Sequence, residues 1–186
     1  MLIQETTLKG AFLIDVELHV DDRGSFGRTF CSREFREHGL DPRVEQCNVS
    51  YNRNRGTLRG MHYQQAPHQE AKLVRCARGA IYDVIVDLRP DSVTFRLWAA
   101  FELIAEPGSP SKMVYVPKGF AHGFLTLRDD TEVFYQMSEF FEPGAARGFR
   151  WNDPVFRIHW PEPVRVISDR DRTYSDFAVQ QPAMES

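Results

Sequence analysis

Residues 72–88 read KLVRCARGAIYDVIVDL, two short apolar runs that are separated by Arg78-Gly79. Each run has the length of a β-strand, and the second is rich in the β-branched residues that strands favour. A glycine between two such runs is typical of a turn. This stretch therefore predicts two strands, at 72–77 and 80–88, joined by a turn at Arg78-Gly79.

The same pattern continues on both sides of this stretch. Further strand-like segments are at 12–20, 95–104, 113–116 and 131–137. Turn residues separate several of them, at 89–92, 107–110 and 117–119. Short strands at roughly 10-residue spacing with Gly/Pro turns indicate a β-sandwich or barrel. We therefore expect an all-β fold.

One short helix interrupts the strands. Ser32 is its expected N-cap, Glu34 to His38 form its body, and Gly39 ends it. The 186 residues predict a single domain, with a core from about 12 to 172. The tail at 173–186 has few core-forming residues, so we expect it to pack on a partner subunit or to fray.

Composition excludes several classes of protein. The 23 Lys+Arg and 26 Asp+Glu give a net charge of −3, which does not fit a dedicated nucleic-acid binder. No apolar run reaches the ~18 residues of a membrane span, and residues 1–6 do not resemble a signal peptide. Cys31, Cys47 and Cys76 have no CxxC spacing and indicate reduced thiols. We expect a cytoplasmic protein that binds neither nucleic acid nor membranes.

Two of the six histidines stand in unusual contexts. His62 lies in a strand-like stretch that follows a glycine turn, and His122 follows the Pro117-Lys118-Gly119 turn. Most histidines are structural, and other polar residues also have ordinary interpretations. A lysine at a strand start, such as Lys72, is usually solvated, and a mid-strand Tyr135 is usually core. Asp171 alone would be read as surface charge.

The two histidine segments resemble the paired motifs of the cupin superfamily, whose members are double-stranded β-helix (jelly-roll) barrels. Gly56 to His62 matches the spacing of the first motif, and Pro117 to His122 matches the second. The metal-binding set of that superfamily is incomplete, because Gln64 replaces its second histidine. A mononuclear metal site needs about three or four converging donors, so we expect no metal and no other cofactor.

Nearly the whole chain, from about 12 to 172, is similar to the dTDP-4-dehydrorhamnose 3,5-epimerases, which are metal-independent jelly-roll enzymes of deoxysugar biosynthesis. The matching segments, in order, are 22–24, 46–48, 58–64, 71–75, 82–89, 117–124, 132–135 and 151–154. The resemblance implies removal of a proton beside the C4 ketone of a nucleotide-linked 4-keto-6-deoxyhexose and its return from the opposite face. Rhamnose or another deoxyhexose for a polysaccharide is the implied product.

The resemblance also implies the catalytic residues. His62 would be the base, since an imidazole is suited to proton abstraction at neutral pH, and Asp171 would orient it. Lys72 would stabilise the enolate oxygen, and Tyr135 would donate the proton from the opposite face.

The implied substrate-binding residues are spread along the chain. Arg23 and Arg59 would bind the diphosphate. Phe141 would stack on the base; the remaining positions are Gln46, Asn48, His122 and Arg170. Strict alternation places Arg59 and His62 on opposite faces of one strand, so we expect a β-bulge at Gly60.

Two positions depart from the family pattern, since Arg28 and Ala146 stand where glutamates are common. The reaction type is therefore better indicated than the nucleotide, and CDP- or GDP-sugars remain alternatives, as does epimerisation at C3 only. The resemblance implies a homodimer with N-terminal strand exchange, in which residues 12–20 pair across subunits and the Arg23 region completes the neighbour's site. Alternatives of other classes are a metal-dependent cupin and a non-catalytic sugar-binding module.

Overall fold

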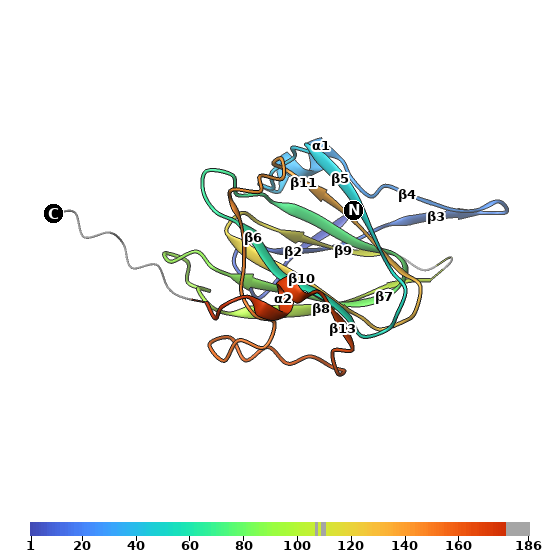
Figure 1. The fold of residues 1–186 in the computed structure, drawn as a ribbon. Helices are drawn as coiled ribbons and strands as arrows, with labels where there is room; N and C mark the ends of the chain where they lie inside the picture. Colours follow the sequence, from blue (N-terminus) through green and yellow to red (C-terminus); the bar gives the residue numbers. More distant parts are fainter. Residues whose placement is uncertain (107, 109–110, 178–186) are drawn as a thin grey trace.

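The computed structural model describes residues 1–106, 108 and 111–177, which are mostly strand (Figure 1). In chain order the elements are β1 (Leu2–Glu5), β2 (Phe12–Asp15), β3 (Leu18–Asp21), β4 (Gly24–Gly27), α1 (Ser32–Glu37), β5 (Gln46–Asn52), β6 (Thr57–Gln64), β7 (Lys72–Asp87), β8 (Trp98–Ala105), β9 (Lys112–Val116), β10 (Phe120–Thr126), β11 (Thr131–Met137), β12 (Ala146–Gly148), β13 (Val166–Ile167) and α2 (Asp169–Thr173). The all-β expectation is confirmed.

Strand β7 links the two sheets of the barrel. Its first half pairs with β9 and β11, and its second half pairs with β8 and β10. The predicted turn at Arg78-Gly79 is wrong, because the strand runs through without interruption from Lys72 to Asp87. Gly79 has φ +83°, and a Cβ there would lie 2.4 Å from the Thr131 hydroxyl. Gly79 therefore allows β7 to change direction at a point where β11 lies too close for a side chain.

The two sheets face each other as in a jelly roll. One has the order β1-β2-β9-β7-β11-β5, and the other has the order β8-β7-β10-β6, with β12 and β13 on the outer side of β6. Because β5 and β11 belong to the first sheet and β6 and β10 to the second, their inward side chains meet across the barrel. This arrangement positions the site described below.

Alternation along β7 explains why both of its faces are apolar. Val74, Cys76, Ile81 and Ile85 belong to the cluster that fills one end of the barrel. Val84 and Val86 point outward, where Phe149 and Phe156 of the C-terminal segment cover them. A strand covered on both faces has no polar side, which is why residues 80–88 are apolar at both alternating sets of positions, apart from the buried Asp83 and Asp87.

The N-terminal part differs from the predicted single strand at 12–20. It forms two strands, because β2 pairs with β1 and β9 while β3 pairs with β4 in a separate hairpin. Both edges of β2 are thus occupied within the chain, which removes the expected motive for pairing residues 12–15 across subunits. The β3–β4 hairpin extends away from the sheets (Figure 1), and Val20 and Phe26 on it are 75% and 70% exposed.

The helices and the tail also correct the expectations. Helix α1 begins one residue early, with Cys31 at the N-cap and no side-chain cap, and Gly39 follows its end at φ +73° as expected. Helix α2 was not expected. Phe177 packs on Phe149 and Phe156, so the tail up to this residue lies against its own chain. Residues 178–186 of the expected tail lie outside the described residues.

Candidate active site

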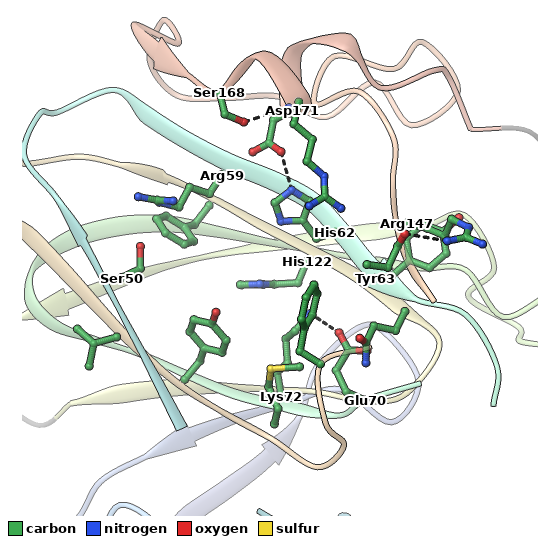
Figure 2. A pocket seen from close by; sticks show the side chains of 18 of the residues that line it. Ser50, Arg59, His62, Tyr63, Glu70, Lys72, His122, Arg147, Ser168 and Asp171 are labelled. Atoms are coloured by element: carbon green, nitrogen blue, oxygen red, sulfur yellow. Dashed lines mark hydrogen bonds and ion pairs between the residues drawn. The ribbon is translucent and has the colours of Figure 1, made fainter. Parts of the chain in front are cut away.

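A cavity of about 540 Å³ lies between the two sheets at the end of the barrel that the apolar cluster leaves open (Figure 2). Both sheets, strand β12 and helix α2 contribute side chains to it. The lining residues are Val49, Ser50, Tyr51, Arg59, His62, Tyr63, Gln64, Glu70, Lys72, His122, Phe124, Tyr135, Met137, Phe141, Ala146, Arg147, Ser168, Arg170 and Asp171. All four catalytic residues that the sequence predicts are in this set.

His62 and Asp171 form a hydrogen-bonded pair at the cavity wall. The His62 Nε2 lies 2.7 Å from Asp171 Oδ1, and the second carboxylate oxygen accepts a hydrogen bond of 3.2 Å from the Gly60 N–H. Because an ionised carboxylate only accepts, Nε2 carries the proton and the Nδ1 lone pair is free. The imidazole is 42% exposed and the aspartate 6%, so the histidine can reach a ligand that the carboxylate cannot.

The charge of Asp171 is preserved by its hydrogen bonds. Burial raises the pKa of this carboxyl, but the hydrogen bonds from His62 and from the Gly60 N–H outweigh burial and hold the pKa below its usual range. Ser168 caps helix α2, since its hydroxyl accepts from the Asp171 N–H at 3.1 Å. The short helix thereby presents a fixed carboxylate to His62.

A bulge in β6 places Arg59 and His62 in one cavity. His62 pairs with His122, and Arg59 pairs with Phe124, so three steps on β6 oppose two on β10. Gly60 lies within the irregularity at φ +141°, and a Cβ there would stand 2.6 Å from the Gly123 Cα. The expected bulge at Gly60 is confirmed, and it reconciles the positions of Arg59 and His62.

Tyr135 and Lys72 belong to the sheet opposite His62. Tyr135 lies on β11, and burial raises the pKa of its phenol; the charge of Glu70 adds to this effect and that of Arg59 opposes it. Lys72 begins β7, and its Nζ lies 2.6 Å from Glu70 Oε1. The Tyr135 phenol and the Lys72 side chain thus face His62 from across the cavity.

A second His–Asp pair, which the sequence analysis missed, lies deeper. His122 Nε2 is 2.7 Å from Asp83 Oδ2, and Asp83 is fully buried on β7. The signal was present, because Asp83 interrupts an apolar strand at an inward position, where a buried charge needs a partner. The Asp83 pairing fixes the His122 ring in the cavity wall.

The predicted substrate-binding residues divide into two groups. Arg59, His122, Phe141 and Arg170 line the cavity. The Arg59 Nε donates to Asn52 Oδ1 at 2.8 Å, and the Arg170 Nε donates to the Tyr174 hydroxyl at 2.7 Å. Both guanidiniums are therefore held from one side, with their other N–H groups available.

Gln46, Asn48 and Arg23 do not line the cavity of this chain. The Gln46 side chain accepts from the Phe141 N–H at 2.6 Å and so supports the segment that carries Phe141. Asn48 pairs with Tyr135 across β5 and β11. Arg23 lies at the tip of the β3–β4 hairpin, bonded to Asp21 and exposed.

Ala146 and Arg28, the two departures from the family pattern, lie in different places. Ala146 lines the cavity beside Arg147, whereas Arg28 lies outside it and binds Glu34 at 3.2 Å. Only the alanine therefore bears directly on the cavity of one chain.

Within the described part of the chain, no group of three or more His, Cys, Asp or Glu side chains is placed to hold a metal ion. The cavity histidines are bonded to separate aspartates. Among the same residues, no helix has the length and apolar character required to cross a membrane.

Comparison with known proteins identifies the family. A family model described as dTDP-4-dehydrorhamnose 3,5-epimerase matches residues 5–178. The protein of that name from Methanothermobacter thermautotrophicus is 41% identical over 173 residues, which are 91% of each chain.

Solved structures agree with the sequence comparison. A crystal structure of dTDP-4-dehydrorhamnose 3,5-epimerase from Bacillus anthracis, with TDP and PPi bound, matches at TM-score 0.89 and 39% identity, covering 95% of this chain and 99% of that one. ChmJ, a 3'-monoepimerase from Streptomyces bikiniensis solved with dTDP-quinovose, matches at TM-score 0.82 and 33% identity, covering 92% and 85%. The jelly-roll fold, the cavity and these similarities together show that the chain belongs to the dTDP-4-dehydrorhamnose 3,5-epimerase family, a family of isomerases.

Proposed function

We propose that this chain is a dTDP-4-dehydro-6-deoxy-D-glucose 3,5-epimerase, which forms dTDP-4-dehydro-L-rhamnose. One observation carries the proposal: the His62–Asp171 pair and Tyr135 lie on opposite walls of one cavity, with the Lys72 ammonium in the same cavity. Inversion of a carbon beside a ketone requires a base on one face, an acid on the other and a positive charge at the oxygen.

The steps follow from this arrangement. The free Nδ1 of His62 removes the proton from the carbon beside the C4 ketone, and the electron pair of the C–H bond moves to the ketone oxygen. Asp171 stabilises the imidazolium that forms, and the Lys72 ammonium stabilises the enolate oxygen. Tyr135 then donates its proton to the opposite face of the same carbon. The molecular formula is unchanged, and both residues recover their protonation states from water.

The nucleotide would occupy the outer part of the cavity. Arg59 and Arg170 supply guanidiniums that suit a diphosphate. Phe141 is 51% exposed at the rim, as a ring that stacks on a base must be. The TDP bound to the Bacillus anthracis relative supports a thymidine nucleotide.

Two further features belong to this proposal. The enzyme is a homodimer in which the β3–β4 hairpin, carrying exposed Val20, Phe26 and Arg23, reaches the partner's cavity. It is a single-domain enzyme that acts in the cytoplasm and needs no metal ion. Its product serves the synthesis of rhamnose or a related deoxysugar for a polysaccharide. The three cysteines are free thiols, which fits a reducing compartment.

Solvent-deuterium incorporation tests the proposal. The chain is incubated in D₂O with dTDP-4-keto-6-deoxyglucose, and label at C3 and C5 is followed by NMR. We expect both positions to exchange, with or without EDTA, and His62→Ala and Tyr135→Phe to abolish product formation. His159→Ala is the matched control, because this histidine is exposed and outside the cavity.

The outcomes separate the alternatives. Label at C3 alone would make the protein a 3-epimerase. Exchange only with a CDP- or GDP-sugar would show that the substrate carries a nucleotide other than dTDP. Ala146 would then be the first position to examine. The absence of exchange with all of these substrates would contradict the epimerase assignment and favour a sugar-binding module.

A further inference from the structure

Glu70 is a buried carboxylate in the cavity that the mechanism above does not use. It lies two residues before the start of β7 and is 7% exposed, and Lys72, the first residue of the strand, is 9% exposed. Their charged atoms are 2.6 Å apart. Figure 2 shows both residues on the side of the cavity away from Asp171 and Ser168.

Burial of both charges makes this pair different from a surface ion pair. An exposed lysine moves among many rotamers, and its ion pairs contribute little. A buried ammonium without a partner is strongly unfavourable, and removal of one partner leaves the other uncompensated. Glu70 therefore holds the Lys72 ammonium at one place on the wall.

The carboxylate also acts on a second group in the cavity. Its charge helps to raise the pKa of the Tyr135 phenol, after the larger effect of burial and against the charge of Arg59. Asp171, which is bonded to His62, lies on the opposite side of the cavity from Glu70 (Figure 2).

We propose that Glu70 is a positioning residue that fixes the Lys72 ammonium at the ketone oxygen. This inference rests on the proposed epimerase activity. The carboxylate does not exchange a proton with substrate; it holds the Lys72 side chain on the wall opposite His62.

The other ionisable groups that share the cavity with Glu70 come from several elements. They are Lys72 on β7, Tyr135 on β11, Arg59, His62 and Tyr63 on β6, His122 on β10, Tyr51 on β5, Arg147 on β12, and Arg170 and Asp171 on α2. Because the cavity holds three tyrosines, a change on the alkaline side of a pH–rate profile is assigned with the tyrosinate titration, in which Tyr135→Phe is the blank.

Glu70→Gln keeps the size of the side chain and removes its charge. We expect kcat at neutral pH to fall about tenfold or more, with a smaller change in KM, because the ammonium acts mainly on the enolate. We expect the alkaline limb of the kcat profile to move to lower pH, since the negative charge of Glu70 helps to raise the pKa of the Tyr135 phenol. Glu102→Gln, an exposed glutamate on β8, is the control.

Two further measurements keep the inference open to contradiction. Ultraviolet titration of tyrosinate, with Tyr135→Phe as the blank, should show the Tyr135 transition at lower pH in Glu70→Gln, independently of turnover. Glu70→Asp keeps the charge and withdraws it by one methylene, so kcat should fall while the alkaline limb stays at its wild-type position. This variant serves if Glu70→Gln does not fold by circular dichroism.

The results distinguish this inference from the proposed function. A wild-type protein that exchanges no label refutes the epimerase assignment itself. A wild-type protein that exchanges label, together with a Glu70→Gln variant whose kcat, KM and alkaline limb are all unchanged, refutes the role of Glu70 alone. An alkaline limb moved in Glu70→Asp with unchanged kcat would also overturn it.

Discussion

His62 and His122 are directly opposed on β6 and β10, and each is bonded through Nε2 to a different aspartate at 2.7 Å. Their surroundings differ, because the His62 side chain is 42% exposed and the His122 side chain 10%. Both histidines thus form a His–Asp pair, but the His62 pair is open to a ligand and the His122 pair is enclosed in the cavity wall. The open pair suits proton transfer, and the enclosed pair suits a fixed contact.

Asp171→Asn should lower kcat by at least about 10²-fold, because the amide cannot stabilise the imidazolium that forms on His62. The measurement is the rate of label incorporation at saturating substrate. Asp169→Asn is the matched control, since Asp169 lies on the same helix with its side chain 96% exposed, and its rate should stay within about twofold of wild type. Equal rates for both variants would remove Asp171 from the mechanism.

Gly148→Ala should lower both stability and activity. A Cβ at this position would lie 2.5 Å from the Tyr174 ring and 2.7 Å from the Met61 carbonyl oxygen. Tyr174 holds Arg170 and follows α2, so its displacement moves the helix that carries Asp171. We expect a loss of about 1–3 kcal/mol in the free energy of unfolding, measured in urea, with reduced kcat/KM.

The control for this substitution is Gly144→Ala. The added Cβ would lie 3.5 Å from the flexible Glu142 side chain, which is ordinary van der Waals contact. Gly144→Ala should therefore behave as wild type. A Gly148→Ala variant with wild-type stability and rate would show that the space beside Tyr174 is not needed.

Asp87 should make the fold sensitive to acid. It is fully buried and bound by Arg89, Ser92 and Thr94. Burial raises the pKa of this carboxyl, but these hydrogen bonds outweigh it and lower the pKa below the ordinary 3.8. A carboxyl with a lower pKa in the folded state adds stability above its unfolded pKa, and that stability is lost as the pH falls through the folded value.

Asp87→Asn should therefore reduce the free energy of unfolding at pH 7 by about 3–5 kcal/mol. The difference from wild type should narrow below about pH 4, where the wild-type carboxyl begins to lose its advantage. Urea unfolding across this pH range measures both effects. Asp91→Asn is the control on the same turn, where the carboxylate is exposed. A difference that stays constant with pH would contradict the assignment.

The thiols should react in a fixed order. Burial raises the pKa of Cys76 to about 11, and the side chain is enclosed in the barrel. Cys47 is exposed on β5. Because the thiolate is the reactive form, a disulfide reagent should modify Cys47 in the folded protein and Cys76 only in urea. Peptide mass spectrometry assigns the sites, and Cys47→Ser should remove the fast reaction.

Local patterns in the sequence predicted those features that depend on neighbouring residues. The strand at Thr131–Met137 agrees with its prediction residue for residue, and the face shared by Arg59 and His62 followed from one glycine. The proposed catalytic residues came from the family resemblance, which carries information on tertiary structure that the alternation of apolar residues does not.

Features that depend on distant residues could not be predicted in this way. Gly79 looks like a turn residue, and only the approach of Thr131 shows that it bends a continuous strand. The pairing of Asp83 with His122 joins residues 39 positions apart. Helix α2 is too short for periodicity to reveal, although Ser168 followed by Asp171 is a capping pattern.

The close approach of the β6 and β10 backbones at Gly60 and Gly123 has a consequence for redesign. A Cβ on Gly60 would meet the Gly123 backbone at 2.6 Å, and a Cβ on Gly123 would meet Arg59 and Gly60 backbone atoms at 2.9 and 3.0 Å. This wall cannot accept a single added methyl group, whichever of its two glycines is varied. Libraries that seek new substrates should therefore leave Gly60 and Gly123 unchanged. They should randomise Ala146 and Arg147, which line the cavity from the short outer strand β12.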